Sequence, residues 1–244
     1  MACRMLVAAG KLPIPKILDA FKLMAMNQNE KHEININQPE LRHGDGWGIV
    51  YNKNNKLEWY KKPIPCWEDP KYKECYNINT DFLILHARKA SQGSPITYEF
   101  THPFEKEGWF FCHNGTIHDF LSQDRSDSET FFMLLLEKLK EQKDVVTAIK
   151  TALSSVKRYT ALNFILANKE KAYVLNRFTN ESHKAYYIMK YLQEDNFTIV
   201  TSERLKNLGQ KWKEMGNGML VELDVNTCRI KVASCTIAPA RFES

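Results

Sequence analysis

The sequence predicts an α+β protein in which antiparallel sheets are covered by helices. Short apolar segments of strand type fill much of the first half, and two adjacent helical segments follow between residues 126 and 156. The last third then returns to short apolar segments separated by turn residues. Strands that are grouped in this way indicate antiparallel sheets with helices packed against them. A doubly wound parallel sheet fits the pattern poorly, because it needs strands and helices in alternation.

The first half supplies strands and one helix. Asn54 and Asn55 separate two strand-like runs and are typical of a tight turn between paired strands. Residues 14–24 differ, because their apolar positions recur with helical spacing. Apolar runs of strand length occur at 1–9, 46–51, 56–60, 81–87 and 109–113.

The second half begins with the two predicted helices. Ser126 and Glu129 have the spacing of a capping box ahead of an apolar run that ends at Leu139, and a second helix is expected over 145–156. Further strands are expected at 162–167, 172–175, 197–201, 219–223 and 229–233. Because the sequence has no internal repeat or low-complexity linker, we expect one domain over residues 1–244.

The composition is that of an ordinary globular protein. Of the 244 residues, 43% are hydrophobic and 26% are charged, which argues against disorder and fibrous classes. The net charge of +5 comes from interleaved basic and acidic residues, so a nucleic-acid surface is not expected. No apolar run is long enough to cross a membrane, and no signal peptide is evident. We therefore expect a cytoplasmic protein with no membrane partner and with free thiols.

Polar residues gather at the ends of several predicted strands. Each cluster has a structural interpretation: a cysteine that begins a buried strand is usually a small hydrophobic residue, and an Asn-Gly pair commonly makes a turn. A cysteine at a mature N-terminus has a further use, because its own α-amine can act as the general base. The clusters are Cys3 with Arg4, 43–48, 86–91, and 101–104 with 111–116.

Three residues of these clusters, together with Asp127 beside the predicted helix cap, suit an amide substrate. Asn114 and Gly115 follow an apolar strand, and an amide N–H with a glycine N–H could stabilise the oxyanion that forms at a carbonyl. Arg88 could pair with a surface carboxylate, but its planar fork also suits the α-carboxylate of an amino acid. Asp127 could be a first-turn acid of its helix or could receive a substrate α-ammonium.

Two other kinds of site are not expected. The seven histidines include no His-x-x-x-His pair, and none of the six cysteines forms a Cys-x-x-Cys pair, so no metal site is predicted. The glycines at 44–48 lack the Gly-x-Gly-x-x-Gly spacing and do not lead into a helix, which argues against a dinucleotide site.

Taken together in order, these motifs resemble those of the class II glutamine amidotransferases, which use an N-terminal cysteine. The resemblance includes the small stand-alone members and covers about the first 130 residues. It rests on Cys3 with Arg4, Asp-Gly-Trp-Gly-Ile at 45–49, His-Ala-Arg at 86–88, Thr-His-Pro-Phe at 101–104, His-Asn-Gly at 113–115 and Ser-Asp-Ser-Glu at 126–129. The family implies a four-layer α/β/β/α sandwich of two antiparallel sheets, the N-terminal nucleophile hydrolase type.

The resemblance also implies a role for each site residue. Cys3 would attack the amide carbon of glutamine, and Asn114 with Gly115 would hold the oxyanion. Water would then release glutamate, with no cofactor. Arg88 matches the arginine that binds the substrate α-carboxylate, and Asp127 matches the acid that binds the α-ammonium. In addition, His102 matches a histidine that lines the pocket, while 45–48 matches a structural strand start.

One departure from the family concerns Ala2. Family members begin Met-Cys, so that loss of methionine exposes the cysteine, whereas here Ala2 lies between Met1 and Cys3. A backbone amide nitrogen is not a base, so activity requires that Ala2 be removed, that the true start lie elsewhere, or that Ala2 was inserted for expression. We favour the last of these.

The sequence thus predicts hydrolysis of the side-chain amide of glutamine, or of a related γ-glutamyl amide, to give glutamate and ammonia. The expected partner is the small-molecule substrate. Larger relatives consume the ammonia in a second domain, for which 244 residues leave no room, so we expect either a separate protein that accepts ammonia or simple hydrolysis. The alternative belongs to another class: a catalytically inactive subunit that binds amino acids or regulates another chain, with Cys3 blocked by Ala2.

Overall fold

The structure is a computed structural model that describes residues 3–32, 36–122 and 125–233. Two antiparallel sheets lie face to face, as predicted. The first has the strand order β11-β9-β10-β1-β4-β2-β3, and the second has the order β13-β12-β8-β7-β6-β5. The first sheet consists of β1 (Arg4–Gly10), β2 (Trp47–Lys53), β3 (Lys56–Lys62), β4 (Phe82–Ala87), β9 (Lys190–Gln193), β10 (Phe197–Thr201) and β11 (Lys213–Glu214). The second consists of β5 (Phe104–Lys106), β6 (Trp109–Asn114), β7 (Asn163–Ala167), β8 (Lys171–Asn176), β12 (Met219–Asp224) and β13 (Ile230–Ala233).

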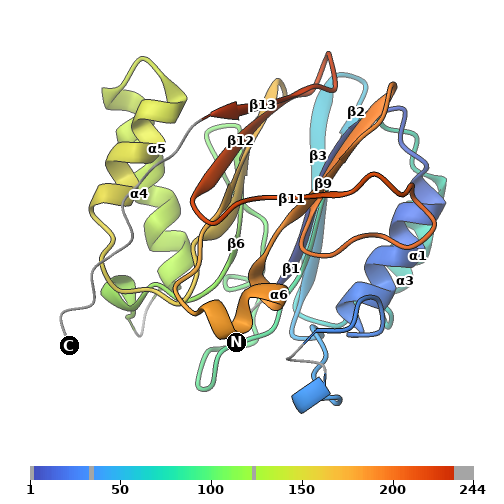
Figure 1. Cartoon of the computed structure of the whole chain (residues 1–244), viewed down its shortest axis with the longest axis horizontal. Coiled ribbons are helices and arrows are strands. Elements are labelled where there is room, and N and C mark those ends of the chain that lie inside the picture. The colour runs from blue at the N-terminus through green and yellow to red at the C-terminus, as the bar shows by residue number, and fades with distance from the viewer. Residues whose placement is uncertain (1–2, 33–35, 123–124, 234–244) are drawn as a thin grey trace.

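Helices cover the outer faces of both sheets (Figure 1). On the first sheet these are α1 (Ile14–Ala25) and α3 (Pro70–Glu74), and on the second they are α4 (Asp127–Glu141) and α5 (Val145–Ser154). A short helix, α6 (Lys184–Tyr187), lies near the start of β1. The order helix, sheet, sheet, helix is the predicted four-layer α/β/β/α sandwich.

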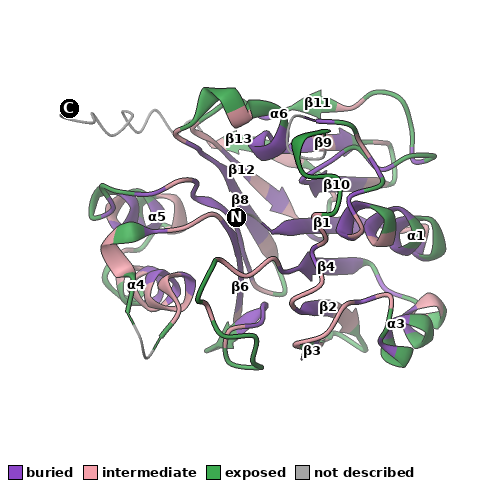
Figure 2. Ribbon diagram, turned by 90° about the horizontal axis from the view of Figure 1, so that it is seen from below, coloured by how far each residue is buried: buried purple, intermediate pink, exposed green. Residues whose placement is uncertain are grey.

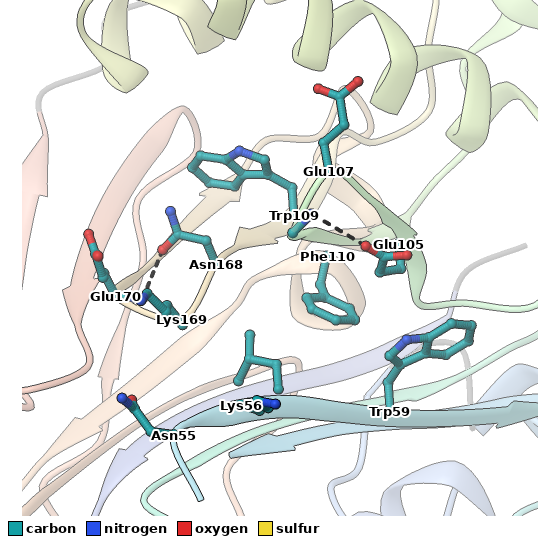
Figure 3. A pocket seen from close by; sticks show the side chains of 12 residues that line it. Asn55, Lys56, Trp59, Glu105, Glu107, Trp109, Phe110, Asn168, Lys169 and Glu170 are labelled. Carbon is teal, nitrogen blue, oxygen red and sulfur yellow. Dashed lines mark hydrogen bonds between the residues drawn. The ribbon is translucent and has the colours of Figure 1, made fainter. Parts of the chain in front are cut away.

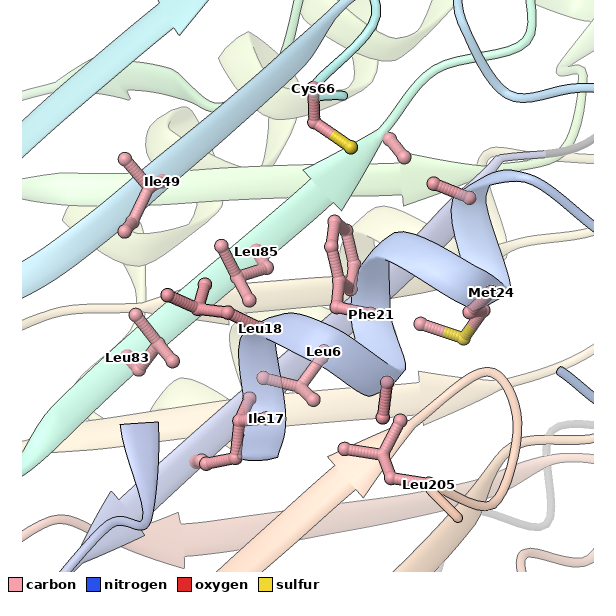
Figure 4. Close-up of a cluster of buried hydrophobic side chains, with 14 of the residues drawn as sticks. Leu6, Ile17, Leu18, Phe21, Met24, Ile49, Cys66, Leu83, Leu85 and Leu205 are labelled. Atoms are coloured by element: carbon pink, nitrogen blue, oxygen red, sulfur yellow. The ribbon is translucent and has the colours of Figure 1, made fainter. Parts of the chain in front are cut away.

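Each interface between layers has its own apolar core. In Figure 4, Ile17, Leu18 and Phe21 of α1 pack on Leu6 and Leu85 of the first sheet. A second cluster joins α4 and α5 to the second sheet, and a third fills the space between the sheets. Figure 2 shows the result, since the central strands are almost entirely buried whereas the helices expose their outer turns. Each Å² of apolar surface that is buried contributes about 25 cal/mol to folding, so these contacts are the main source of stability.

The central strand β1 fixes the direction in which the N-terminal residues point. It pairs with β4 and β10, with Arg4 opposite Ala87 and Met5 opposite His86. Side chains alternate along a strand, so Met5 faces the other sheet while Leu6 faces α1. By the same alternation, Cys3 lies on the face that looks into the space between the sheets.

The predicted long elements are confirmed with small differences in their bounds. The capping interaction is present, because the Ser126 hydroxyl accepts a hydrogen bond from the Glu129 N–H at 3.0 Å. The first strand is described from Arg4 onward, and residues 1 and 2 lie outside the described residues. The sequence did not predict α3, α6, β5, β9 and β11, whose two to five residues are too few for a period to show. Across the described residues, no helix combines the length and apolarity that a membrane crossing requires.

Candidate active site

Cys3 lies where the two sheets meet at one end of the sandwich. It directly precedes β1 and is only 7% exposed. Its backbone nitrogen donates a hydrogen bond to Oδ1 of Asn114, the last residue of β6, at 2.5 Å. Its sulfur lies 3.9 Å from the carbonyl oxygen of Lys89. These contacts join residues that are 111 and 86 positions apart in the sequence, and they bring three of the predicted clusters together.

Asn114 and Gly115 have the geometry of a rigid donor pair. Asn114 is 1% exposed, and its Nδ2 atom has no hydrogen-bond partner among the described residues, although Oδ1 is held by Cys3. Gly115 has a φ of +146°, and a Cβ atom there would overlap the carbonyl oxygen of Ala161. Only glycine therefore fits this position. Among the described residues, Asn114 thus has an unused amide donor on the same side chain that binds the Cys3 nitrogen.

Arg88 follows β4 and lies next to the same end of β1. It is 5% exposed and donates hydrogen bonds to the Pro95 carbonyl at 2.9 Å and to the Ser94 hydroxyl at 2.8 Å. Within the described parts of the chain its guanidinium forms no ion pair, and both of its hydrogen bonds go to uncharged groups. Burial lowers the pKa of Arg88, and the charges of Cys3, Asp45 and Asp127 oppose that shift. The guanidinium is thus buried without a carboxylate, a condition that favours a carboxylate ligand.

Asp127 begins α4, as the structural interpretation expected. Its Oδ2 atom accepts a hydrogen bond from the Ile117 N–H at 2.6 Å, while Ser128 Oγ lies 3.4 Å from Oδ1. The same Ser128 hydroxyl is 2.8 Å from Nδ1 of His113. Asp127 is half-buried and is close enough to Cys3 and Arg88 to influence the pKa of both. The carboxylate is therefore held by its neighbours at a place where its charge acts on both the thiol and the guanidinium.

His102 is the predicted site residue whose surroundings are least polar. It is 4% exposed, its ring lies 4.3 Å from that of His86 and 4.5 Å from that of Phe104, and neither ring nitrogen has a partner among the described residues. Burial, followed by the charge of His86, holds the pKa of His102 well below its usual value. Among the described residues it makes no hydrogen bond to Cys3, Arg88 or Asp127, so its place in a substrate pocket stays a prediction.

The electrostatics around Cys3 favour a neutral thiol. Burial is the largest influence and raises the thiol pKa, whereas the Lys89 carbonyl contact and the charge of Arg88 lower it and the charge of Asp127 raises it. A buried thiol of this kind needs a base to become a nucleophile. Burial likewise holds the pKa of His86 at about 3, and it lowers that of His113. The neighbouring histidines are consequently neutral, and neither lies within hydrogen-bond distance of the sulfur.

The 45–48 segment has a structural role, as expected. Asp45 accepts a hydrogen bond from the Ala90 N–H at 2.9 Å and pairs with Lys89 at 3.0 Å. The carbonyl of Gly46 accepts from the Arg88 N–H at 2.7 Å. At Gly48 a side chain would collide with the carbonyl of His102. This segment therefore holds the backbone of residues 88–90 in place.

Sequence reasoning missed the residues that support the site from behind. Ser94 and Pro95 hold the Arg88 guanidinium, and Tyr186 and Glu203 contact the side chain of Arg4. No motif marks these four residues, because their contacts with the site depend on tertiary structure. Only Arg4 carried a signal, as a charged residue within an otherwise apolar strand.

A separate cleft lies between β3 of the first sheet and the β5–β6 hairpin of the second sheet (Figure 3). Its volume is about 620 Å³, and its walls come from β3, the β5–β6 hairpin and the β7–β8 turn. Trp59, Trp109 and Phe110 form its apolar part. None of the predicted site residues lines it, so the predicted chemistry does not involve this cleft.

Comparisons with known proteins agree with the motifs and the fold. The family profile described as glutamine amidotransferases class-II matches residues 21–240. Putative glutamine amidotransferase YafJ of Escherichia coli is 32% identical over 114 residues, which are 41% of this chain and 44% of that protein. Gamma-glutamyl-hercynylcysteine sulfoxide hydrolase of Mycobacterium tuberculosis is 31% identical over 78 residues, 32% of this chain and 34% of that protein. The alignments thus span less than half of the length of these two relatives.

A solved structure supports the fold independently. Glutamine phosphoribosylpyrophosphate amidotransferase from B. subtilis superposes with a TM-score of 0.66 at 17% sequence identity, over 95% of this chain and 49% of that one. At such low sequence identity, the superposition supports only the shared fold. The profile match covers most of the chain, and the same motifs meet at one end of the sandwich. The chain belongs to the class II glutamine amidotransferases.

Proposed function

We propose that the chain cleaves the side-chain amide of glutamine, or of a related γ-glutamyl compound, with Cys3 as the nucleophile. The observation that carries this proposal is the hydrogen bond between the Cys3 nitrogen and Asn114 Oδ1. The contact joins the backbone of the proposed nucleophile to Asn114, whose Nδ2 donor has no partner among the described residues, and this supports the two roles. The family membership supports amide hydrolysis or transfer as the reaction class.

The proposed reaction uses a free α-amine at Cys3. This amine takes the thiol proton, and the sulfur attacks the carbonyl carbon of the amide. Asn114 Nδ2 and the Gly115 N–H stabilise the oxyanion of the tetrahedral intermediate. The α-amine returns the proton to the leaving nitrogen, which departs as ammonia or an amine and leaves a γ-glutamyl thioester. Attack by water on the thioester then releases glutamate and restores the thiol.

The substrate is held through its α-carbon groups. Arg88 presents a buried guanidinium for the α-carboxylate, and Asp127 presents a fixed carboxylate for the α-ammonium. These two groups select a γ-glutamyl moiety but do not contact what lies beyond the amide nitrogen. A relative that is named as a γ-glutamyl hydrolase supports this wider substrate class. Ammonia released by the reaction either passes to a separate protein or leaves by diffusion.

The test compares two forms of the chain that differ only at the N-terminus. One begins with Ala2 and the other lacks it, so that Cys3 comes first; intact mass confirms each. Glutamate release from glutamine should appear in the Cys3-first form alone, because an acylated nitrogen is not a base. If neither form releases glutamate, the alternative of an inactive amino-acid-binding or regulatory subunit is favoured.

In the Cys3-first form, Cys3→Ala should lower turnover by at least about 1,000-fold, as is usual when a nucleophile is removed. The melting temperature should change by only a few degrees, because the substitution deletes one buried atom. Glutamate release and thermal unfolding are measured on the same sample. Unchanged turnover in Cys3→Ala would end the case for this nucleophile.

A further inference from the structure

We propose that a buried cluster around Arg4 positions the nucleophile that precedes it in the chain, an inference that rests on the proposed function. The cluster consists of Arg4, His32, His43, Tyr186 and Glu203 and is called the Arg4 cluster below. None of these residues contacts the reacting atoms in the proposed mechanism. They are positioning residues, and they act through the backbone that joins Arg4 to Cys3.

Arg4 is held on three sides although it is completely buried. Its Nη2 atom lies 2.9 Å from Glu203 Oε1 and 2.8 Å from His32 Nε2, and Nη1 donates to the Tyr186 carbonyl at 3.1 Å. The guanidinium also stacks 3.8 Å above the centre of the Tyr186 ring. A planar fork that is bonded and stacked in this way has one orientation. Consequently the backbone at the start of β1 has little freedom to rotate.

Glu203 supplies the charge that keeps Arg4 in place. Its second oxygen accepts hydrogen bonds from Asn29 Nδ2 at 2.9 Å and from the Glu30 N–H at 3.0 Å. Burial opposes ionisation of this carboxyl, but the charge of Arg4 and the hydrogen bonds hold its pKa at about 2. The ion pair is therefore intact at neutral pH.

Tyr186 connects the cluster to the helix on the first sheet. Its hydroxyl lies 2.9 Å from His43 Nε2, and His43 Nδ1 lies 3.1 Å from the Ala25 carbonyl at the end of α1. Tyr186 belongs to α6, so this short helix is fixed to both β1 and α1. In Figure 1, α6 lies directly beside the start of β1.

The neighbouring residue Tyr187 links α6 to the second sheet and closes a circuit. Its carbonyl accepts a hydrogen bond from Asn163 Nδ2 at 2.6 Å. Asn163 is the register partner of Asn114, whose Oδ1 holds the Cys3 nitrogen. The contacts thus run from Cys3 through Arg4, α6 and Asn163 to Asn114 and back to Cys3. Both sheets hold the nucleophile through this closed path.

Stability alone does not account for a buried ion pair at this position. Apolar side chains of similar volume usually give equal or greater stability, because burying two charges requires their desolvation. The charged and hydrogen-bonded groups instead fix the orientation of the Arg4 side chain. Side chains alternate along a strand, so Arg4 projects from the face opposite to Cys3, and fixing Arg4 also holds the Cys3 backbone nitrogen against Asn114 Oδ1. Displacement of a reacting group by about 1 Å can lower a rate about 100-fold.

The test replaces the whole ion pair with apolar residues in the Cys3-first chain. Arg4→Met alone leaves Glu203 charged and buried, which strongly destabilises the fold, so the informative variant is Arg4→Met with Glu203→Leu. We expect this double variant to unfold near the wild-type temperature. Its kcat for glutamine should fall about 10- to 100-fold while KM stays within about twofold, because binding groups are untouched.

Alkylation of Cys3 by iodoacetamide, followed by mass spectrometry, reports the position of the thiol without requiring turnover. Release of the strand start should expose the thiol, which is 7% exposed in the intact protein, and should raise the rate about threefold or more. Failure of the proposed function would appear as a wild-type chain that does not turn over, and the alkylation rates then decide the role of the cluster alone.

Thr198→Val is the matched control. Thr198 is also completely buried, it lies opposite Ala9 at the other end of β1, and its hydroxyl donates a hydrogen bond to the Cys228 carbonyl. Its loss should lower the melting temperature but leave kcat and the alkylation rate unchanged. Arg4→Lys keeps the charge without the planar fork and should give an intermediate kcat; it also serves if the double variant does not fold. The inference would be overturned if the folded double variant had the kcat and the alkylation rate of the wild type. If the double variant does not fold, the same result for Arg4→Lys would overturn it.

Discussion

The space between the two sheets has two ends that differ in kind. Over most of its length it is filled by apolar side chains such as Val7, Ile84 and Leu223, all of which are fully buried. At the end where β1 begins, the same strands present Cys3 and Asn114, which are also buried but polar. Along the inner face of β1, the change from polar to apolar occurs between Cys3 and Met5. The apolar end provides stability, and the polar end retains unsatisfied groups that a substrate can use.

The largest expected effect falls at the polar end. Asn114→Ala removes the free amide donor, and loss of one oxyanion donor usually lowers kcat about 100- to 1,000-fold. The fall in kcat is measured as glutamate release by the Cys3-first chain. Asn168→Ala, in the turn between β7 and β8, removes an amide far from the thiol and should leave kcat unchanged. Equal kcat values for Asn114→Ala and wild type would remove the oxyanion role.

At the apolar end, Leu223→Ala should lower the free energy of unfolding by about 3 kcal/mol, because it leaves a cavity in a close-packed core. The catalytic constants of the folded fraction should not change. Urea denaturation gives the stability. Val232→Ala in the adjacent β13 is the control, since Val232 is 52% exposed and its loss should change stability by less than about 0.5 kcal/mol. A large fall in kcat for Leu223→Ala would show that the two ends are coupled.

Arg88→Ala tests whether the polar end binds substrate through charge. We expect KM for glutamine to rise about 30-fold with a smaller change in kcat, since charge-assisted hydrogen bonds contribute about 2 kcal/mol. Steady-state kinetics separate the two constants. Arg88→Lys retains the charge but not the fork, and its KM should lie between the others. An Arg88→Ala enzyme with wild-type KM would assign the α-carboxylate to another residue.

The last effect concerns stability in acid. Burial holds the pKa of His86 at about 3, so the folded state keeps this ring neutral while the unfolded state binds a proton below about pH 6.5. The stability linked to His86 is therefore complete above pH 6.5 and declines as the pH falls toward 3. One such group contributes a slope of about 1.4 kcal/mol per pH unit. His86→Gln should flatten the curve in urea denaturation between pH 7 and 4, and an unchanged slope would assign the loss to other groups, such as His43.

Much of the fold followed from local sequence patterns. The apolar spacing over α1, the capping pair Ser126 and Glu129, and the turn at Asn54 and Asn55 each reflect interactions within a few residues. Short elements such as α6 and β9 were not predicted, because four residues contain no period. Tertiary contacts determine them instead; the backbone of α6 is held by Arg4 and Asn163.

The candidate site divides in the same way. The sequence by itself determined which chemical groups are present, from the cysteine at a strand start to the Asn-Gly pair after β6, because strand ends and residue types are local properties. Only the tertiary structure decided that Asn114 Oδ1 meets the nitrogen of Cys3 and that Arg88 is buried against the Pro95 carbonyl and the Ser94 hydroxyl. It also revealed Glu203, which no motif marks, as the partner of Arg4. The physical reason is distance along the chain: contacts across more than 100 residues depend on how two sheets pack.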